Sequence, residues 1–286
     1  KLIDCFMYFD EDLVLDIRLN TLTDKVDKFI IVEATKNHAG QDKKLNFRIE
    51  NFSKFKHKIN YLIIDDLPVD VESPKKGWHE NHTRDQYQRN SIARGYEKYH
   101  DNDLIMISDI DEIPNPKKIE EFNIKNKYAC FLQKNFQSKI NLLNITDGDW
   151  PGTKICQKKF LKSPQWLRNI KDRKYPFYRL DTFFSDSKYI DIKIISNGGW
   201  HFSNLKTASE IEFKLKSYLH HREFDENPLS VEEINDLIKN KQAIYDLKVD
   251  KRVNKIGDGS KLEKYPTDKL PKFLQNNLND YKEWID

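Results

Sequence analysis

The chain has 286 residues, of which 38% are hydrophobic, 12% aromatic and 33% charged. This composition predicts a folded protein, built as one large domain or two small ones, and excludes a disordered chain. The 49 basic and 46 acidic residues leave a formal net charge of +3. Such a balance gives no support for nucleic-acid binding.

No stretch approaches the roughly 18 apolar residues that a membrane helix needs, and no signal peptide is recognised at the start of the sequence. The three cysteines, Cys5, Cys130 and Cys156, form no C-x-x-C pair. We expect them to be buried free thiols in a reduced compartment.

The first 122 residues alternate short apolar runs with amphipathic stretches, which is typical of βαβ units and a mostly parallel sheet flanked by helices. Four apolar runs predict strands, at residues 2–8, 29–32, 59–64 and 104–107. Between the first two strands, helical spacing of apolar residues predicts a helix buried on one side, with the positions Leu15, Leu19, Leu22 and Val26. A long polar helix is predicted over residues 78–99.

The second half of the chain is less regular. Further strands are predicted at residues 128–133, 153–156 and 190–195. Two Ser/Thr–Glu pairs have the spacing of capping boxes and predict helix starts, Thr207 with Glu210 and Ser230 with Glu233. We therefore predict a single α/β domain with a core over residues 1–225, in which residues 1–122 form the nucleotide-binding half and 123–225 the second half. Residues 226–286 would add helices and a wrapping tail.

The fourth predicted strand leads directly into Asp109-Ile110-Asp111. Strand alternation would place both carboxylates on one side and Ile110 in the core. Ligands of open α/β sheets bind beyond the carboxyl ends of the strands, so the two carboxylates are expected at a substrate site. Such oxygens suit Mg²⁺ or Mn²⁺. The alternative is an ordinary polar triplet at a strand end, because Asp-x-Asp is common.

The segment from Ser108 to Pro114, with the sequence SDIDEIP, resembles the metal-binding motif of glycosyltransferase family 17. Other segments resemble the same family in the expected order, namely 32–35 with Gly40, 88–90, 150–154 and 198–203. The resemblance covers most of the chain up to about residue 225, whereas residues 163–188 and the tail match poorly. It implies a GT-A fold, a UDP-sugar donor such as UDP-N-acetylglucosamine, Mn²⁺ (or Mg²⁺) as cofactor, a glycan or glycoprotein acceptor, and inversion at the anomeric carbon.

The resemblance also suggests metal ligands. Asp111 is predicted to bind the metal directly, and Asp109 to bind either the metal or the ribose side of the donor. His201 is the predicted third ligand, since a neutral imidazole binds Mn²⁺ and the paired glycines before it let the backbone approach a bound group. The alternative for His201 is a buried structural histidine.

Further residues are predicted to bind the donor. Arg89 and Lys154 are candidates to contact the diphosphate, although Arg89 could instead form an i,i+4 ion pair with Asp85. Glu33 and Thr35 are candidates to face the nucleoside. Inverting transfer also needs a base for the acceptor proton, and the spacing selects none of three candidates, Asp147, Asp149 and Asp181.

Two other functions stay open on the sequence alone. A metal-dependent nucleotidyl- or phosphotransferase also uses carboxylates at strand ends, although the chain has no G-x-x-x-x-G-K-[ST] loop. A catalytically silent nucleotide-sugar-binding module could share the fold. We expect a cytoplasmic protein or a soluble catalytic domain, with the Golgi lumen as the alternative if an N-terminal anchor has been removed.

Overall fold

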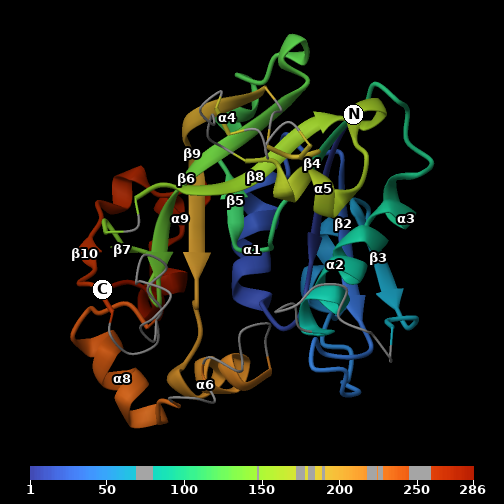
Figure 1. The fold of residues 1–286 in the computed structure, drawn as a ribbon. Helices are drawn as coiled ribbons and strands as arrows, with labels where there is room; N and C mark the ends of the chain where they lie inside the picture. Colours follow the sequence, from blue (N-terminus) through green and yellow to red (C-terminus); the bar gives the residue numbers. More distant parts are fainter. Residues whose placement is uncertain are drawn as a thin grey trace.

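The computed structural model shows a ten-stranded sheet with helices on both faces (Figure 1), which confirms the predicted α/β class. The residues described by the structure are 1–68, 80–146, 148–171, 178–179, 184–188, 191–217, 224, 228–244 and 259–286. Within these residues, no helix has the length and apolar character that crossing a membrane requires.

The first half of the sheet consists of four parallel strands, which agree closely with the four predicted apolar runs. They are β1 (Leu2–Met7), β2 (Lys28–Ala34), β3 (Ile59–Ile64) and β4 (Leu104–Ile107). Their spatial order is β3-β2-β1-β4. Strands β2 and β3 are added on one side of β1 and β4 on the other, so the strand order reverses between β1 and β4. In open α/β sheets, ligands bind at such a reversal, beyond the carboxyl ends of the strands.

The second half of the sheet is mixed. Three long strands extend it, β6 (Tyr128–Gln137), β8 (Trp150–Gln157) and β9 (Ile192–Ser203). Strand β8 runs antiparallel to β4 and β6, whereas β6 and β9 are parallel. Three short antiparallel strands complete the sheet, β5 (Glu112–Pro114), β7 (Leu142–Leu143) and β10 (Glu263–Lys264). One sheet therefore continues through both halves of the predicted core.

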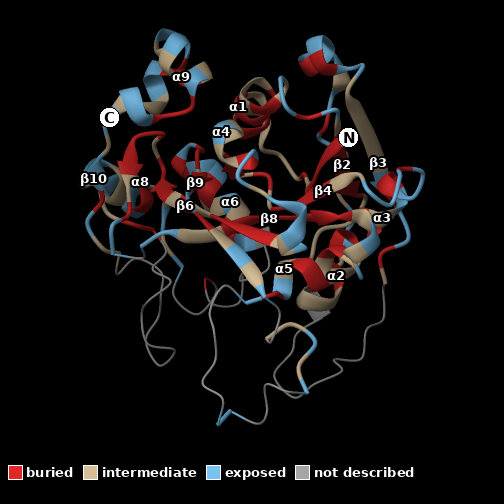
Figure 2. Ribbon diagram, turned by 90° about the horizontal axis from the view of Figure 1, so that it is seen from above, coloured by how far each residue is buried: buried red, intermediate tan, exposed pale blue. Residues whose placement is uncertain are grey.

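Helices cover the two faces of the sheet and enclose separate cores. One face carries α1 (Asp12–Leu22) and α9 (Lys272–Asn276), and the other carries α2 (Glu80–Ser91), α3 (Ala93–Tyr96) and α5 (Pro164–Asn169) (Figures 1 and 2). Figure 2 shows that buried residues concentrate in the central strands. Neighbouring residues of β1 alternate between the cores, since Phe6 packs on the α1 side and Cys5 on the α2 side.

The remaining helices surround this frame. Those with bounds among the described residues are α4 (Pro116–Ile119), α6 (Ala208–Ser217), α8 (Val231–Lys239) and the 3-10 helices Ile49–Phe55, Ile124–Asn126, Lys158–Phe160, Thr267–Lys269 and Leu278–Trp284. Both predicted capping boxes are present. Thr207 and Glu210 exchange two hydrogen bonds, and so do Ser230 and Glu233. All three cysteines are buried thiols outside any disulfide, as predicted.

One long helix was predicted over residues 78–99, but the structure has two helices there, α2 and α3. Residues 78–79 of the predicted range lie outside the described residues. Helix α2 ends at Ser91, whose hydroxyl donates to the carbonyl oxygen of Tyr87 at 2.9 Å. Such a bond to the preceding turn competes with regular helical bonding and favours a bend.

Gly198 and Gly199 allow a close backbone approach, but the approach is to the chain itself and not to a ligand as predicted. A Cβ atom on Gly199 would lie 2.1 Å from the carbonyl oxygen of Ile113, because β5 pairs tightly with β9 at this point. Gly199 also has a φ of +145°, which L side chains rarely adopt. The two glycines therefore join strands and position the residues that follow them.

We predict that Gly199→Ala lowers the free energy of unfolding by roughly 3 kcal/mol, from backbone strain and overpacking against β5. The matched control is Gly148→Ala, at a φ of +71° with no atom within 4 Å of the added carbon. It should cost about 1 kcal/mol, from strain alone. Urea denaturation of both variants measures the difference, and equal losses would contradict the steric explanation.

Candidate functional site

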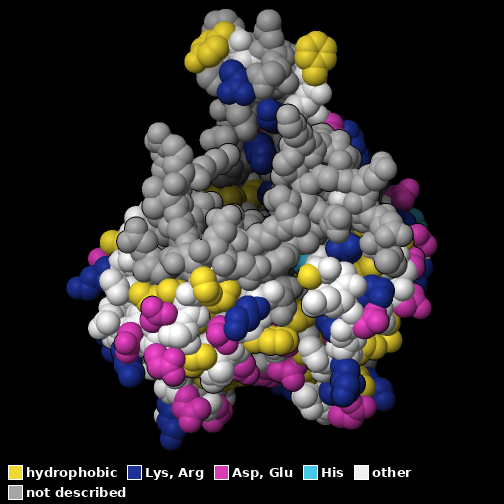
Figure 3. Space-filling view, turned by 60° about the horizontal axis from the view of Figure 1, so that its bottom comes forward, with side chains coloured by type: hydrophobic (Ala, Val, Ile, Leu, Met, Phe, Trp, Pro, Cys, Tyr) yellow, Lys and Arg dark blue, Asp and Glu magenta, His cyan; other side chains and the backbone are white. Residues whose placement is uncertain are grey.

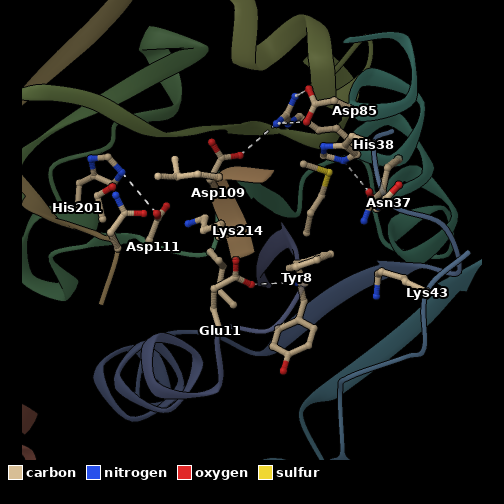
Figure 4. Close-up of a pocket in the computed structure, with 18 of the residues that line it drawn as sticks. Tyr8, Glu11, Asn37, His38, Lys43, Asp85, Asp109, Asp111, His201 and Lys214 are labelled. Carbon is tan, nitrogen blue, oxygen red and sulfur yellow. Dashed lines mark hydrogen bonds and ion pairs between the residues drawn. The ribbon is translucent and has the colours of Figure 1, made fainter. Parts of the chain in front are cut away.

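A cavity of about 390 Å³ lies beyond the carboxyl ends of β1, β2 and β4, where the order of the strands reverses. In Figure 4, Asp111 and His201 lie at one end of it, Asn37 and His38 lie at the other, and Asp109 lies between them. The residues lining the cavity are Met7, Tyr8, Phe9, Glu11, Lys36, Asn37, His38, Lys43, Asp85, Gln88, Arg89, Asp109, Ile110, Asp111, Asn135, Gln137, Trp150, His201, Ser203, Asn204, Lys214 and Leu215.

The two predicted aspartates sit on a turn and not on a continuation of the strand, because β4 ends at Ile107. Both side chains nevertheless line the cavity, and Ile110 between them is buried in the core, as predicted. We call residues 108–112 the acidic turn.

Arg18, on helix α1, binds the acidic turn from the core side. Its guanidinium is fully buried and donates to the carbonyl oxygens of Asp109, Ile110 and Glu112 at 3.1, 3.0 and 2.9 Å. The same guanidinium donates to both carboxylate oxygens of Asp4, at 2.8 and 2.6 Å, and to the Ser108 hydroxyl at 2.6 Å. A buried cation is costly unless it is paired and hydrogen-bonded, and Arg18 meets both conditions.

Asp109 is held between two guanidinium groups. Arg89 donates to one carboxylate oxygen at 3.2 Å and Arg168 to the other at 2.7 Å. Burial would raise the pKa of Asp109, but Arg168 and Arg89 outweigh that effect and hold the pKa well below its usual range. Asp109 is therefore an anion whose oxygens already have cationic partners.

Both interpretations of Arg89 have support. The side chain lines the cavity, and it also forms the i,i+4 ion pair with Asp85 at 2.7 Å. Arg168 was not predicted from the sequence. It connects the acidic turn to helix α5, because it also forms two hydrogen bonds to the buried carboxylate of Glu112, at 2.7 and 2.5 Å.

Asp111 and His201 face each other at one end of the cavity. The His201 Nε2 atom lies 3.6 Å from an Asp111 carboxylate oxygen, which is longer than a hydrogen bond. Burial would lower the pKa of His201, but the Asp111 carboxylate outweighs that effect and raises it. The imidazole stacks on the Trp150 indole, with ring centroids 4.8 Å apart, and the Trp150 Nε1 donates to Glu112 at 2.7 Å.

This pair of side chains fits a divalent ion. Metal–oxygen and metal–nitrogen bonds to Mn²⁺ or Mg²⁺ are about 2.1 Å long, so two ligands of one ion can lie 3.6 Å apart. An imidazole protonated on Nδ1 would turn the lone pair of Nε2 toward the Asp111 carboxylate, and its Nδ1–H would then be buried without a hydrogen-bond partner among the described residues. A cation between Nε2 and the carboxylate would relieve that repulsion.

Asp109 does not complete a three-ligand site. Across the described part of the chain, no three His, Cys, Asp or Glu side chains come close enough together to hold a metal ion. Asp111 and His201 are two predicted ligands that the structure places 3.6 Å apart, and their binding of a metal ion stays a prediction.

Three of the predicted donor-binding residues are not among those lining the cavity, Glu33, Thr35 and Lys154. Glu33 instead pairs with Lys43 and accepts from the Tyr61 hydroxyl at 2.8 Å, which anchors the segment after β2. Lys154 is buried, and its amine donates to the carbonyl oxygens of Arg168 and Ile170 at the end of α5. Both side chains are therefore engaged by the scaffold, and their predicted contacts with a donor stay predictions.

The candidate bases are not brought to the cavity within the described residues. Asp149 forms an ion pair with Lys134 at 2.7 Å and does not line the cavity. Asp147 and Asp181 lie outside the described residues.

The structure also brings unpredicted residues to the cavity. Asn135 and Gln137 of β6 lie beside His201 and Ser203 of β9 in register, so these four polar side chains form one wall. The period-two alternation of Gln133, Asn135 and Gln137 was the signal that could have revealed the wall. Asn37, His38 and Lys214 stand in no recognisable spacing to the acidic turn.

Basic and acidic side chains are interspersed over the described part of the face in Figure 3. They do not gather there into a single basic patch of the kind that binds nucleic acid. The mixed surface agrees with the near-balanced charge of the sequence.

The family model described as "Glycosyltransferase family 17" matches residues 1–137. The resemblance indicated by the sequence motifs is therefore confirmed over this part of the chain. The matching segment contains β1, the acidic turn and all of β6, but not His201 or Lys214.

Two curated relatives support the glycosyltransferase class. They are the β-1,4-mannosyl-glycoprotein 4-β-N-acetylglucosaminyltransferases of Homo sapiens and Rattus norvegicus, each 24% identical over 225 residues. The matches cover 71% of this chain and only 40% of each relative.

A crystal structure of glucosyl-3-phosphoglycerate synthase from Mycobacterium tuberculosis, in complex with Mn²⁺, UDP and phosphoglyceric acid, is also similar. The sequence identity is 12% and the TM-score 0.34, and the alignment covers 93% of this chain and 87% of that one. A likeness of this degree supports no conclusion about ligands.

We predict that Arg18→Met lowers the free energy of unfolding by about 3–5 kcal/mol, because Asp4 is left buried without a cation. The double variant Asp4→Leu with Arg18→Met removes both charges and should recover most of that loss. Urea denaturation at pH 7 measures both. Equal losses in the single and double variants would show that the unpaired charge is not the cause.

Proposed function

We propose that this protein transfers a sugar, N-acetylglucosamine, from a UDP-sugar donor to a glycan acceptor with the help of a divalent metal ion and with inversion at the anomeric carbon. The family match and the named relatives support sugar transfer. The observation that carries the finer proposal is the Asp111–His201 pair, which faces the cavity at the strand reversal with the spacing of two ligands of one ion.

The metal ion supplies a positive charge that stabilises the departing diphosphate more in the transition state than in the ground state. Asp111 and His201 would hold it, and His201 binds a metal as the neutral imidazole. Asp111 raises the pKa of His201, so a proton would compete with a metal ion for this ring.

Asp109 has a different part in the proposal. Its two oxygens are engaged by Arg89 and Arg168, so it orients the acidic turn and faces the donor without binding the ion. This is the ribose-side alternative for Asp109, and it explains why two aspartates so close in sequence have different partners.

The opposite end of the cavity is suited to the nucleoside. Asn37 and His38 lie there, just beyond β2 (Figure 4). Burial lowers the pKa of His38, and its Nε2 atom lies 3.1 Å from the Gln88 side-chain oxygen. A neutral imidazole and an amide offer hydrogen bonds without charge, which matches the edge of an uncharged base.

The wall formed by Asn135, Gln137 and Ser203 is suited to sugar hydroxyl groups. Amide and hydroxyl side chains both donate and accept hydrogen bonds, as sugar hydroxyls do. The wall adjoins His201 in the register of β6 and β9, so a sugar bound there lies next to the proposed ion.

The test is release of UDP from UDP-N-acetylglucosamine, with water as acceptor, measured with Mn²⁺ and with EDTA. We expect release only with the metal, and Asp111→Asn should lower the rate by at least about 100-fold because several kcal/mol of metal stabilisation is lost. Asp236→Asn on helix α8, whose side chain is exposed, is the matched control and should behave as the wild type.

Other results separate the alternatives. Release of pyrophosphate would identify a nucleotidyltransferase, and tight UDP binding without turnover on a panel of acceptors would identify a binding module. GDP release in a donor panel would overturn the choice of nucleotide. An undiminished rate in EDTA would overturn the role of the metal.

A further inference from the structure

The proposed donor carries a diphosphate, and the predicted cations for it are already engaged. Lys154 lies outside the cavity, and Arg89 pairs with Asp85 and Asp109. Of the other described lysines that line the cavity, Lys43 pairs with the buried Glu33 and Lys36 with Asp42. Lys214 is the remaining lysine or arginine among the described lining residues, and its amine forms no ion pair or hydrogen bond with a described residue.

Lys214 is close to the proposed metal ligands. Asp111 and Lys214 border the main cavity together and also border the small cavity next to it. In Figure 4 the Lys214 side chain projects into the cavity from α6.

Helix α6, which carries Lys214, is held in place at its start and along one side. Just before the helix, the Lys206 amine donates to the carbonyl and carboxylate oxygens of Asp10, at 2.9 and 2.7 Å, so this end is tied to the loop after β1. The Thr207–Glu210 capping box starts the helix. Ile211 and Leu215 then bury one side of it against α8. The lysine is therefore held over the cavity by a packed helix and not by a loop.

We propose that Lys214 binds the diphosphate of the donor, opposite the ion held by Asp111 and His201, and stabilises the charge that collects on it as the sugar leaves. The inference rests on the proposed function. In the hydrolysis assay, the bond between the anomeric carbon and the phosphate oxygen breaks and its electron pair stays on UDP. The oxygen of water forms the new bond to that carbon, and one proton passes to the solvent.

The helix itself offers a matched control. Lys216 lies two positions on from Lys214, so the two side chains point in different directions. Lys216 is exposed and forms an i,i+4 ion pair with Glu212 at 2.8 Å. Lys214→Met and Lys216→Met therefore remove the same charge from the same helix, and only one of them removes it from the cavity.

The experiment is calorimetric titration of the full chain with UDP, UMP and uridine in Mn²⁺. We expect Lys214→Met to weaken UDP binding by about 10- to 100-fold, the range of one hydrogen bond to a charged group. UMP binding should weaken less, and uridine binding should be unchanged. Lys216→Met should match the wild type, and Lys214→Arg should recover most of the UDP affinity. Mn²⁺ affinity without nucleotide, followed by electron paramagnetic resonance, should be the same in all variants.

Equal UDP affinity in Lys214→Met and the wild type would overturn the proposal and leave the proposed function intact. A uniform loss for UDP, UMP and uridine would also overturn it, because that pattern indicates a structural role. If the wild type itself does not bind UDP in Mn²⁺, the proposed function fails and the role of Lys214 fails with it. Thermal unfolding of each variant, followed by circular dichroism, verifies that the chain is folded.

Discussion

The buried pair of Arg18 and Asp4 is the constraint on which the site depends. A single guanidinium on α1 satisfies a carboxylate on β1 and three carbonyl groups of the acidic turn, at the point where the strand order reverses. The Asp109 and Glu112 carbonyls also accept from the Glu112 N–H and the Thr153 hydroxyl, so Arg18 completes the bonding of the turn and ties it to α1 and β1. The position of Asp109 and Asp111 is thus fixed from the core and not from the solvent side.

Above this anchor, the two aspartates have different electrostatic surroundings. Arg89 and Arg168 neutralise Asp109, whereas Asp111 faces an imidazole across a gap wider than a hydrogen bond. Two identical side chains in one triplet therefore differ in how available they are to an added cation. The difference arises from α2, α5 and β9, which are remote from the triplet in sequence.

Local sequence patterns predicted the frame of the fold well. The four apolar runs became the four parallel strands, and both capping boxes formed, because strand burial and helix capping depend on near neighbours. Asp111 and His201 were predicted to share one site because the family resemblance supplied the long-range information. Arg18, Arg168 and Lys214 were not predicted, since each reaches the site through tertiary packing that leaves no spacing rule. The donor-binding roles of Glu33 and Lys154 stay predictions, since neither side chain is among those that line the cavity.

The position of β9 has a consequence for how the protein acquires its chemistry during synthesis. Asp111 belongs to the turn after β4, whereas His201 arrives on a strand that pairs with β5 and β6 from much later in the chain. Contacts between distant segments require closure of long loops and form slowly, and nascent chains fold from the N-terminal side. The parallel half can therefore assemble around Arg18 before His201 has been synthesised, so any property of the site that needs both Asp111 and His201 would arise only after β9 has paired with β5 and β6.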